Sequence, residues 1–145
     1  MSIVVYNRAD EDHSENPNNY PCYRGGSILG NPYTDKPLHK TLAIYQAKSR
    51  EDAIARYDSY FDMMYSSNAE FKAIVDEIYD KYKRGEDVYL ECYCHPKPCH
   101  CDVIARKIKE RALRDTIKEL KKRRKIEMGK ILSPSGDRRD TGEDS

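Results

Sequence analysis

The sequence of 145 residues contains no tryptophan and only two phenylalanines, so its twelve tyrosines must supply most of the aromatic packing. A buried tyrosine needs a hydrogen-bond partner for its hydroxyl, which favours a thin core with polar edges. No apolar run approaches the roughly 20 residues of a membrane-spanning helix, and the N-terminus lacks the basic flank and long apolar stretch of a signal peptide. We therefore expect one cytoplasmic domain that makes no membrane contact.

Cysteines are few and clustered, since four of the five lie between Cys92 and Cys101. Thiols this close in sequence do not cross-link distant parts of a chain. In a reducing compartment such a cluster is typical of metal binding or thiol chemistry. Cys22 is isolated in the sequence and could reach the cluster only through the fold.

Charge is nearly balanced overall, at +1, but it is distributed unevenly. Residues 106–130 include twelve basic and four acidic side chains. Such a segment is either a solvated helix or a surface that binds phosphates. The candidate nucleic-acid contacts are its consecutive basic residues, Lys121, Lys122, Arg123, Arg124 and Lys125.

Apolar periodicity predicts two strands separated by two helices. The strands are short apolar runs at residues 3–6 and 88–92. Ser49 and Ser67 each begin a capping-box pattern, followed by apolar residues at steps of three and four. Gly85 is a plausible end for the second helix.

A final long helix follows the cysteines, with Asp102 as its expected N-cap and Gly129 as its expected end. The basic residues lie on it, over residues 105–130. Residues 131–145 are mostly Ser, Gly, Asp and Arg, which predicts disorder. The expected organisation is one domain over residues 1–130 and a disordered tail.

The order of strands and helices predicts an α/β fold, with a small, mostly parallel sheet and packed helices. Residues 7–39 lack periodicity and form a long N-terminal loop, in which 25–33 are candidates for a short strand or turn. Ligands of such sheets bind beyond the carboxyl ends of the strands. If the two strands are parallel, the Gly-rich part of this loop and the cysteine loop meet at that edge.

The cysteine segment is open to three interpretations. Thiolate and imidazole are the usual ligands of zinc, although all candidates lie within ten residues, unlike a site built from two separated knuckles. The alternative is catalysis or ligand contact, because a helix N-terminus favours anions and histidine can transfer protons near neutral pH. The third is that the cysteines are small buried core residues. The metal candidates are Cys92, Cys94, Cys99 and His100, and the catalytic candidates are Cys94, Cys99, His100 and Asp102.

The Gly-rich segment matches neither a phosphate-binding P-loop nor a dinucleotide fingerprint. Glycines allow a close approach of ligand and backbone, and arginine can pair with a phosphate. The simpler interpretation is a set of tight turns. The candidate ligand-binding residues are Arg24, Gly26, Ser27, Gly30 and Asn31.

Two motifs carry a resemblance to a known family. Leu90–Cys94 with Pro98–Ile104 resembles the hallmark of a small phage-associated family of unknown function, whose members carry Cys-Trp-Cys and then Pro-Cys-His. That family also has a Gly-Ser-Pro-Leu-Gly-Asn-Pro-Phe stretch, matched here by Gly26–Tyr33. The resemblance covers residues 3–105 and implies a phage or prokaryotic origin, but no activity. Because Cys101 stands where the family usually has Gly or Ala, the resemblance makes it the thiol least expected in a shared site.

Two functions follow as hypotheses. The first is a small, cytosolic, phage-encoded protein that binds or processes a nucleotide or a nucleic-acid component at the Cys/His site beside the Gly-rich loop. The alternative is a zinc-stabilised binding module that contacts nucleic acid or a host protein through its basic C-terminal helix. Whether the protein is an enzyme is left open by the residues.

Overall fold

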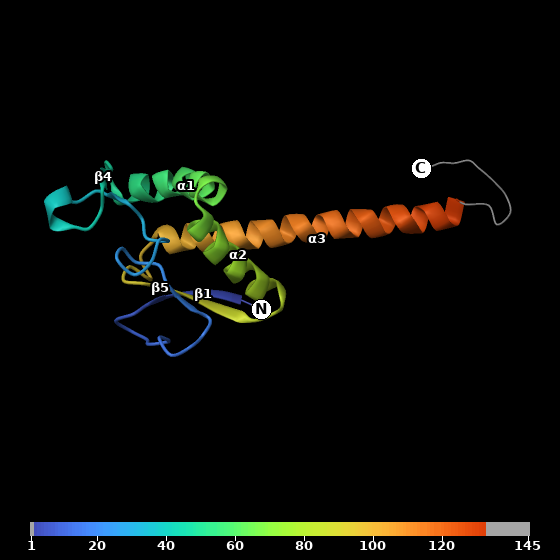
Figure 1. Ribbon diagram of the computed structural model, residues 1–145, viewed down its shortest axis with the longest axis horizontal. Coiled ribbons are helices and arrows are strands. Elements are labelled where there is room, and N and C mark those ends of the chain that lie inside the picture. Colours follow the sequence, from blue (N-terminus) through green and yellow to red (C-terminus); the bar gives the residue numbers. More distant parts are fainter. Residues whose placement is uncertain (1, 133–145) are drawn as a thin grey trace. The chain divides into compact units, whose positions relative to one another are not determined.

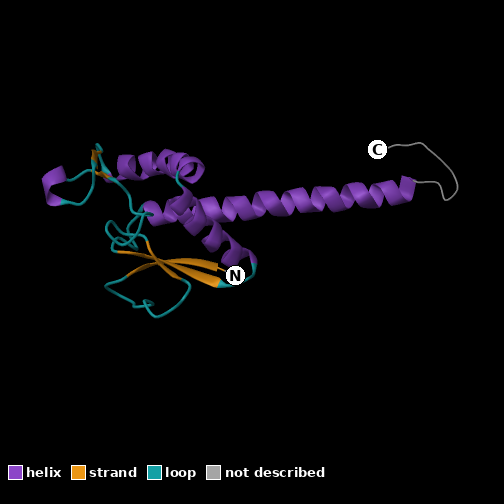
Figure 2. Ribbon diagram, in the orientation of Figure 1, coloured by secondary structure: helices purple, strands orange, loops and turns teal. Residues whose placement is uncertain are grey.

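The computed structural model describes the backbone of residues 2–132 and the side chains of residues 2–129 (Figures 1 and 2). Its elements are β1 (Ser2–Asn7), β2 (Asn19–Pro21), β3 (Tyr33–Thr34), the short 3-10 helix η1 (Leu38–Lys40), β4 (Tyr45–Gln46), α1 (Arg50–Ser67), α2 (Ala69–Lys83), β5 (Asp87–Cys92) and α3 (His100–Leu132). The chain divides into two units, residues 1–109 and residues 110 onward, with the boundary inside α3. The predicted α/β class, with a small parallel sheet and a long C-terminal helix, is confirmed.

The main sheet is parallel, with strand order β1-β5-β2, so that β5 is central. The register pairs Glu91 with Tyr6 on one side and with Pro21 on the other. Parallel strands present their carboxyl ends at one edge. The segments that follow Asn7, Pro21 and Cys92 therefore leave the sheet together.

The long loop predicted over residues 7–39 contains structure that periodicity did not reveal. Its three-residue strand β2 completes the sheet, and Tyr33–Thr34 pairs with Tyr45–Gln46 as a separate two-stranded sheet. Strands of two or three residues are too short to show an alternation of apolar and polar residues. Pro21 at the end of β2 is compatible only with an edge position, which is where β2 lies.

The two faces of the main sheet are covered differently. Leu90 and Cys92 alternate onto the face that α2 and the start of α3 cover (Figure 1). Tyr89 and Glu91 lie on the opposite face, which the loop after β1 covers. There the ring of His13 stacks on that of Tyr89, with 4.3 Å between ring centroids. The loop thus replaces a helical layer on this side.

Helices α1 and α2 start at side-chain caps. Ser49 Oγ accepts the backbone N–H of Asp52 at 3.0 Å, as its capping-box pattern predicts. The second cap is Asn68, which accepts the N–H of Phe71 at 3.0 Å, and not Ser67. Asparagine caps at least as well as serine, and its use lets α1 continue through Ser67.

The core of the first unit is tyrosine-rich, as the composition predicts. Tyr57 is fully buried between α1 and the Gly-rich segment, and its hydroxyl donates to the carbonyl oxygen of Leu29 at 2.7 Å. Phe61 of α1 meets Phe71 of α2 edge to face, with centroids 5.3 Å apart. Within the part of the chain that is described, no helix is long and apolar enough to cross a membrane.

Helix α3 begins at His100, three residues earlier than an N-cap at Asp102 predicts. Asp102 is therefore not its N-cap. Its Oδ2 accepts the backbone N–H of Cys99 at 3.1 Å, so the carboxylate reaches back from the third helical position. This is the reciprocal half of a capping box, and it fixes the entry of the cysteine loop into the helix.

The predicted end of α3 at Gly129 is wrong, because the helix continues to Leu132. A glycine inside a helix costs about 1 kcal/mol relative to alanine but does not by itself end the helix. The tail predicted to be disordered begins at residue 131, still within α3, and residues 133–145 lie outside the described residues.

Candidate metal centre

Three buried thiols gather at the carboxyl edge of the sheet. Cys92 ends β5, Cys99 precedes α3, and Cys101 is the second residue of α3. Their Sγ atoms all lie within 4.8 Å of one another, and each residue is at most 3% exposed. All are free thiols. We call these three residues the thiol cluster. A group of thiols that is buried from solvent is the donor set that soft metal ions select.

The members of the thiol cluster polarise one another. Hydrogen bonds from the Cys101 and Cys99 thiols lower the pKa of Cys92 to about 2, and the backbone N–H of His95 adds a contact to its sulfur at 3.4 Å. Cys101 behaves oppositely, since its hydrogen bonds to neighbouring thiols and its burial raise its pKa. Cys92 is therefore the member of the thiol cluster that most readily loses its proton. Thiolate is the form that binds metal.

The two remaining cysteines extend the cluster on both sides. The thiol of Cys22 interacts with that of Cys101, and the thiol of Cys94 interacts with that of Cys99. The Cys99 thiol and the guanidinium of Arg50 lower the pKa of Cys94 to about 6. All five cysteines of the chain thus form one continuous group. Cys94 alone among them is partly exposed.

Two of these placements differ from the sequence-based expectation. Cys101 was the thiol least expected in the site, yet it is fully buried at the centre of the cluster. Cys22 is isolated in the sequence but joins the group of thiols in the fold. It directly follows β2, and the pairing of β2 with β5 places it beside the end of β5. The available signal for Cys22 was its place three residues before Gly25, in the loop predicted to meet the cysteine loop.

His100 was predicted as a metal ligand and as a catalytic group, and one of its two ring nitrogens bonds to a backbone carbonyl. Nε2 donates to the carbonyl oxygen of Cys22 at 2.5 Å, and the ring packs on that of Tyr57 with centroids 4.9 Å apart. Burial lowers the pKa of His100 to about 4, so the ring is neutral at pH 7. Successive residues of a helix point about 100° apart, so the thiol of Cys101 enters the cluster where the ring of His100 does not.

Asp102, also predicted to be catalytic, and Arg50, which was not, both contact the cysteine loop. Asp102 is exposed and its carboxylate caps the start of α3 through Cys99. Arg50, at the start of α1, donates from Nη1 to the carbonyl oxygen of Pro98 at 3.0 Å. The same guanidinium interacts with the thiol of Cys94. These contacts hold the cysteine loop against α1.

The polar side chains of the Gly-rich segment bind the protein itself. Arg24 Nε donates to the carbonyl oxygen of Asn31 at 2.6 Å, and Ser27 Oγ donates to that of Pro21 at 2.5 Å. The amide of Asn31, which is 4% exposed, donates to the carbonyl oxygen of Ala53 at 3.2 Å. Arg24, Ser27 and Asn31 are therefore engaged by the protein's own backbone, and contact with a ligand stays a prediction.

Close packing explains the glycines of this segment. A Cβ atom on Gly30 would lie 3.0 Å from the Cα of Arg24, and one on Gly26 would lie 2.8 Å from the ring of Tyr23. The ring of Tyr23 in turn contacts that of Tyr93 in the cysteine loop, at 5.0 Å between centroids. The Gly-rich segment and the cysteine loop meet at the carboxyl edge of the sheet, as predicted.

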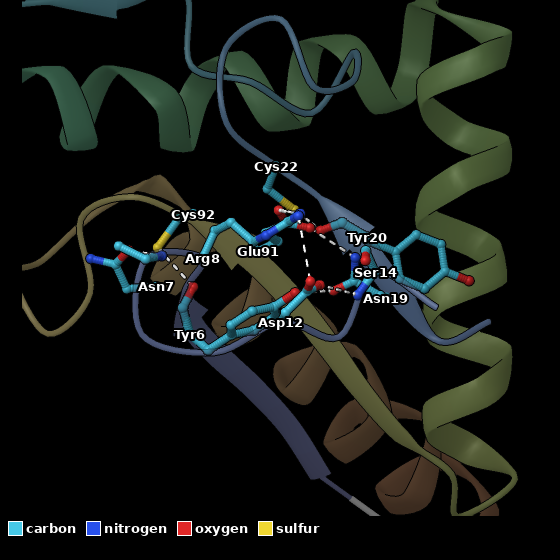
Figure 3. Close-up of polar contacts among 11 residues, drawn as sticks. Tyr6, Asn7, Arg8, Asp12, Ser14, Asn19, Tyr20, Cys22, Glu91 and Cys92 are labelled. Atoms are coloured by element: carbon cyan, nitrogen blue, oxygen red, sulfur yellow. Dashed lines mark hydrogen bonds and ion pairs between the residues drawn. The ribbon is translucent and has the colours of Figure 1, made fainter. Parts of the chain in front are cut away.

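The opposite face of the same edge holds a buried carboxylate that sequence reasoning missed (Figure 3). Glu91 is 1% exposed; its Oε2 lies 2.9 Å from Nη1 of Arg8, and its Oε1 accepts from Nδ2 of Asn19 at 2.8 Å. The hydroxyl of Tyr6 donates to Oδ1 of Asn19 at 2.5 Å, and Asp12 lies 3.6 Å from Arg8. Burial and the nearby Glu91 raise the pKa of Tyr6 to about 12.

A charged residue inside a short buried strand was the available signal for this carboxylate. Its partners come from β1, the loop after β1 and β2, so only the fold brings them together. Their contacts satisfy both carboxylate oxygens of Glu91. The network therefore fastens the loop to the sheet.

The predicted nucleic-acid contacts all lie exposed on α3. They are Lys121, Lys122, Arg123, Arg124 and Lys125. Five consecutive helical residues point in all directions around the axis, because each is rotated by about 100° from the last. One of them, Arg123, lies 3.5 Å from Glu119. The run is thus a positively charged collar around the helix and not a stripe on one side.

All five cysteines and the Gly-rich segment fall within one family match. A model described as a domain of unknown function, DUF4326, matches residues 5–110. The chain belongs to the DUF4326 family. The match ends at the boundary between the two units, so the DUF4326 domain coincides with the first unit and excludes the basic collar. No curated protein and no solved structure matches the chain. The phage association implied by the resemblance stays a prediction.

Proposed function

We propose that the DUF4326 domain of this chain is a metal-stabilised binding module, in which the thiol cluster holds a soft divalent ion of the zinc class. The observation that carries the proposal is the convergence of three buried sulfur atoms, from Cys92, Cys99 and Cys101, within 4.8 Å. Cys22 and Cys94, at the two ends of the group, are the candidates for a fourth ligand. We place the module in the cytoplasm, because free clustered thiols persist in a reducing compartment.

The donor set fits such an ion in chemistry and in spacing. Zinc binds thiolate sulfur at about 2.3 Å, which separates the sulfurs of a tetrahedral site by about 3.8 Å. The observed upper limit of 4.8 Å needs only small side-chain adjustments to reach that value. The hydrogen bond from the backbone N–H of His95 to Cys92 Sγ is a second contact that a structural thiolate site uses.

A metal at this point would connect the parts of the domain that meet at the carboxyl edge. Cys92 belongs to β5 and Cys99 and Cys101 to the start of α3, while Cys22 anchors the Gly-rich segment. Ligands that join separate elements convert metal binding into folding free energy. With free metal at a thousandfold excess over its Kd, the stabilisation is about 4 kcal/mol.

The alternative function, processing of a nucleotide at the Gly-rich loop, has weaker support. Arg24, Ser27 and Asn31 are engaged by backbone carbonyls, and the buried His100 donates to one as well. Each of these side chains already bonds to the protein's own backbone, whereas the hypothesis requires them to bind a phosphate. We therefore favour a structural role for the edge.

Metal content tests the proposal. The full chain, purified under reducing conditions, is equilibrated with zinc, dialysed and measured by mass spectrometry. We expect about one ion per chain in the parent, loss of the ion in Cys92→Ser, Cys99→Ser and Cys101→Ser, and a lower melting temperature after treatment with a chelator.

His100→Gln is the matched control, because glutamine can still donate to the carbonyl of Cys22 and the thiol cluster is left unchanged. It should keep its ion. A folded parent that retains no zinc and melts at the same temperature with and without chelator would refute the proposal. Loss of zinc in a folded His100→Gln would instead restore the ligand set predicted from sequence.

A further inference from the structure

The second unit of the chain carries an apolar stripe that the metal module does not use. Leu113, Ile117 and Leu120 are 61%, 42% and 56% exposed, although they are large and aliphatic. Their spacing of four and three residues places them on one face of α3. We call these three residues the Leu113 stripe. It is the spacing by which one helix packs against another.

Basic side chains border the Leu113 stripe. Arg114 and Lys121 lie along one side of it, each about a quarter turn away, and Arg124 lies in line with it one turn beyond Leu120. All three are exposed. A complementary surface therefore needs apolar side chains in its centre and negative charge along its border.

Neither the chain's own C-terminal residues nor a second copy of the chain meets this requirement. The sequence from Ser133 to Ser145 contains proline but no aliphatic or aromatic side chain, so it offers nothing to cover the stripe. A second copy of α3 offers the right apolar residues. It would, however, place Arg114 and Lys121 of both copies along one interface, where like charges oppose pairing. Nucleic acid would match the charge and leave the stripe in water.

We propose that the Leu113 stripe is a docking surface for an acidic amphipathic helix of a partner protein. Such a helix presents apolar residues every three to four positions with Glu or Asp beside them. Its apolar residues would cover the stripe, and its carboxylates would pair with Arg114, Lys121 and Arg124. The proposal is independent of the metal, since residues 111 onward lie outside the DUF4326 match.

Binding of designed peptides by the full chain tests the proposal. Three labelled peptides of three heptads each carry leucine at the a and d positions and differ only in bordering residues, which are all Glu, all Gln or all Lys. Fluorescence anisotropy gives their affinities. We expect the Glu peptide to bind most tightly, the Gln peptide more weakly and the Lys peptide not at all.

Two variants separate the apolar and the charged contributions. Ile117→Ser should weaken the Glu peptide about tenfold or more, because it removes buried apolar area from the centre of the stripe. Arg114→Glu with Lys121→Glu should reverse the preference to the Lys peptide. Both changes are on exposed positions, and circular dichroism checks that the helix persists.

Four results would overturn the proposal. One is absence of binding by the Glu peptide, and another is binding that Ile117→Ser leaves unchanged. The third is concentration-dependent dimerisation of the parent by light scattering that Ile117→Ser abolishes, because a second copy would then be the occupant. The fourth is a DNA duplex that binds equally well to the parent and to Ile117→Ser and that the Glu peptide does not displace, because the basic residues would then bind nucleic acid.

Discussion

Replacing Glu91 by glutamine removes a buried charge while keeping the size and shape of the side chain. The carboxylate is 1% exposed and accepts two hydrogen bonds, from Arg8 at 2.9 Å and from Asn19 at 2.8 Å. Glutamine keeps an oxygen for Asn19 but presents an N–H group to the guanidinium. One charge-assisted hydrogen bond is lost, and two donors then face each other.

The expected cost follows from the hydrogen bond that is lost. Hydrogen bonds to charged groups contribute about 1.5 to 3 kcal/mol to stability. Part of that is recovered, because Arg8 is 35% exposed and can turn to solvent. We therefore expect the free energy of unfolding of Glu91→Gln to fall by about 2 kcal/mol, measured by urea denaturation at pH 7 with an unchanged slope.

Asp12→Asn is the matched control, since it also removes one carboxylate next to Arg8. Asp12 is 60% exposed and lies 3.6 Å from Arg8, so its loss should leave the urea midpoint unchanged. The two variants together separate burial from charge. If Glu91→Gln were as stable as the parent, the buried network would not hold the loop to the sheet, and the reasoning would be refuted.

Two further predictions concern buried tyrosines. Tyr57→Phe should destabilise the domain by about 1 to 2 kcal/mol, because the buried carbonyl of Leu29 loses its donor. Tyr45→Phe is the control, since Tyr45 is 51% exposed and its replacement should leave the free energy of unfolding unchanged. Equal urea midpoints for the two variants would contradict a stabilising role of the Tyr57 hydroxyl. Stability should also fall as pH rises from 10 towards 12, because the pKa of Tyr6 is about 12 in the folded state and about 10 in the unfolded chain, so the unfolded chain releases its proton first. Urea titrations across that range, with Tyr6→Phe as the comparison, measure the loss, and an identical slope in the two proteins would exclude Tyr6 as its source.

Long elements were predictable because their signals repeat. The capping serine at Ser49 and the apolar steps behind it located α1, and the run at 88–92 located the central strand. The errors fell at ends, where several residues satisfy the same physical need. Asn68 caps α2 in place of Ser67, and Asp102 caps α3 from inside the helix. Gly129 does not end α3, because the cost of one glycine in helix propensity is too small to stop a helix.

The sequence predicted where the candidate site lies but not all of the residues that form it. The spacing of Cys92 and Cys99 showed that thiols would gather after the central strand, and parallel topology placed the Gly-rich segment beside them. Local geometry decided the rest. The direction of side chains in the first turn of α3 turns Cys101 towards the other thiols and His100 towards the carbonyl of Cys22, a choice that depends on where the helix begins.

The three residues of β2 connect the two buried sites of the domain. Asn19 lies on the same face of the sheet as Glu91. Cys22 comes three positions later and lies with the other thiols on the opposite face. Side chains alternate along a strand, so a shift of β2 by one residue would exchange these faces. It would remove Asn19 from the carboxylate and Cys22 from Cys101 at once. A strand of three residues carries too little alternation to fix its own register, so the register must be set by these contacts and by Tyr20 against Glu77 of α2. The fifth cysteine and the buried carboxylate therefore depend on the same pairing, which is why neither could be placed before β2 was known.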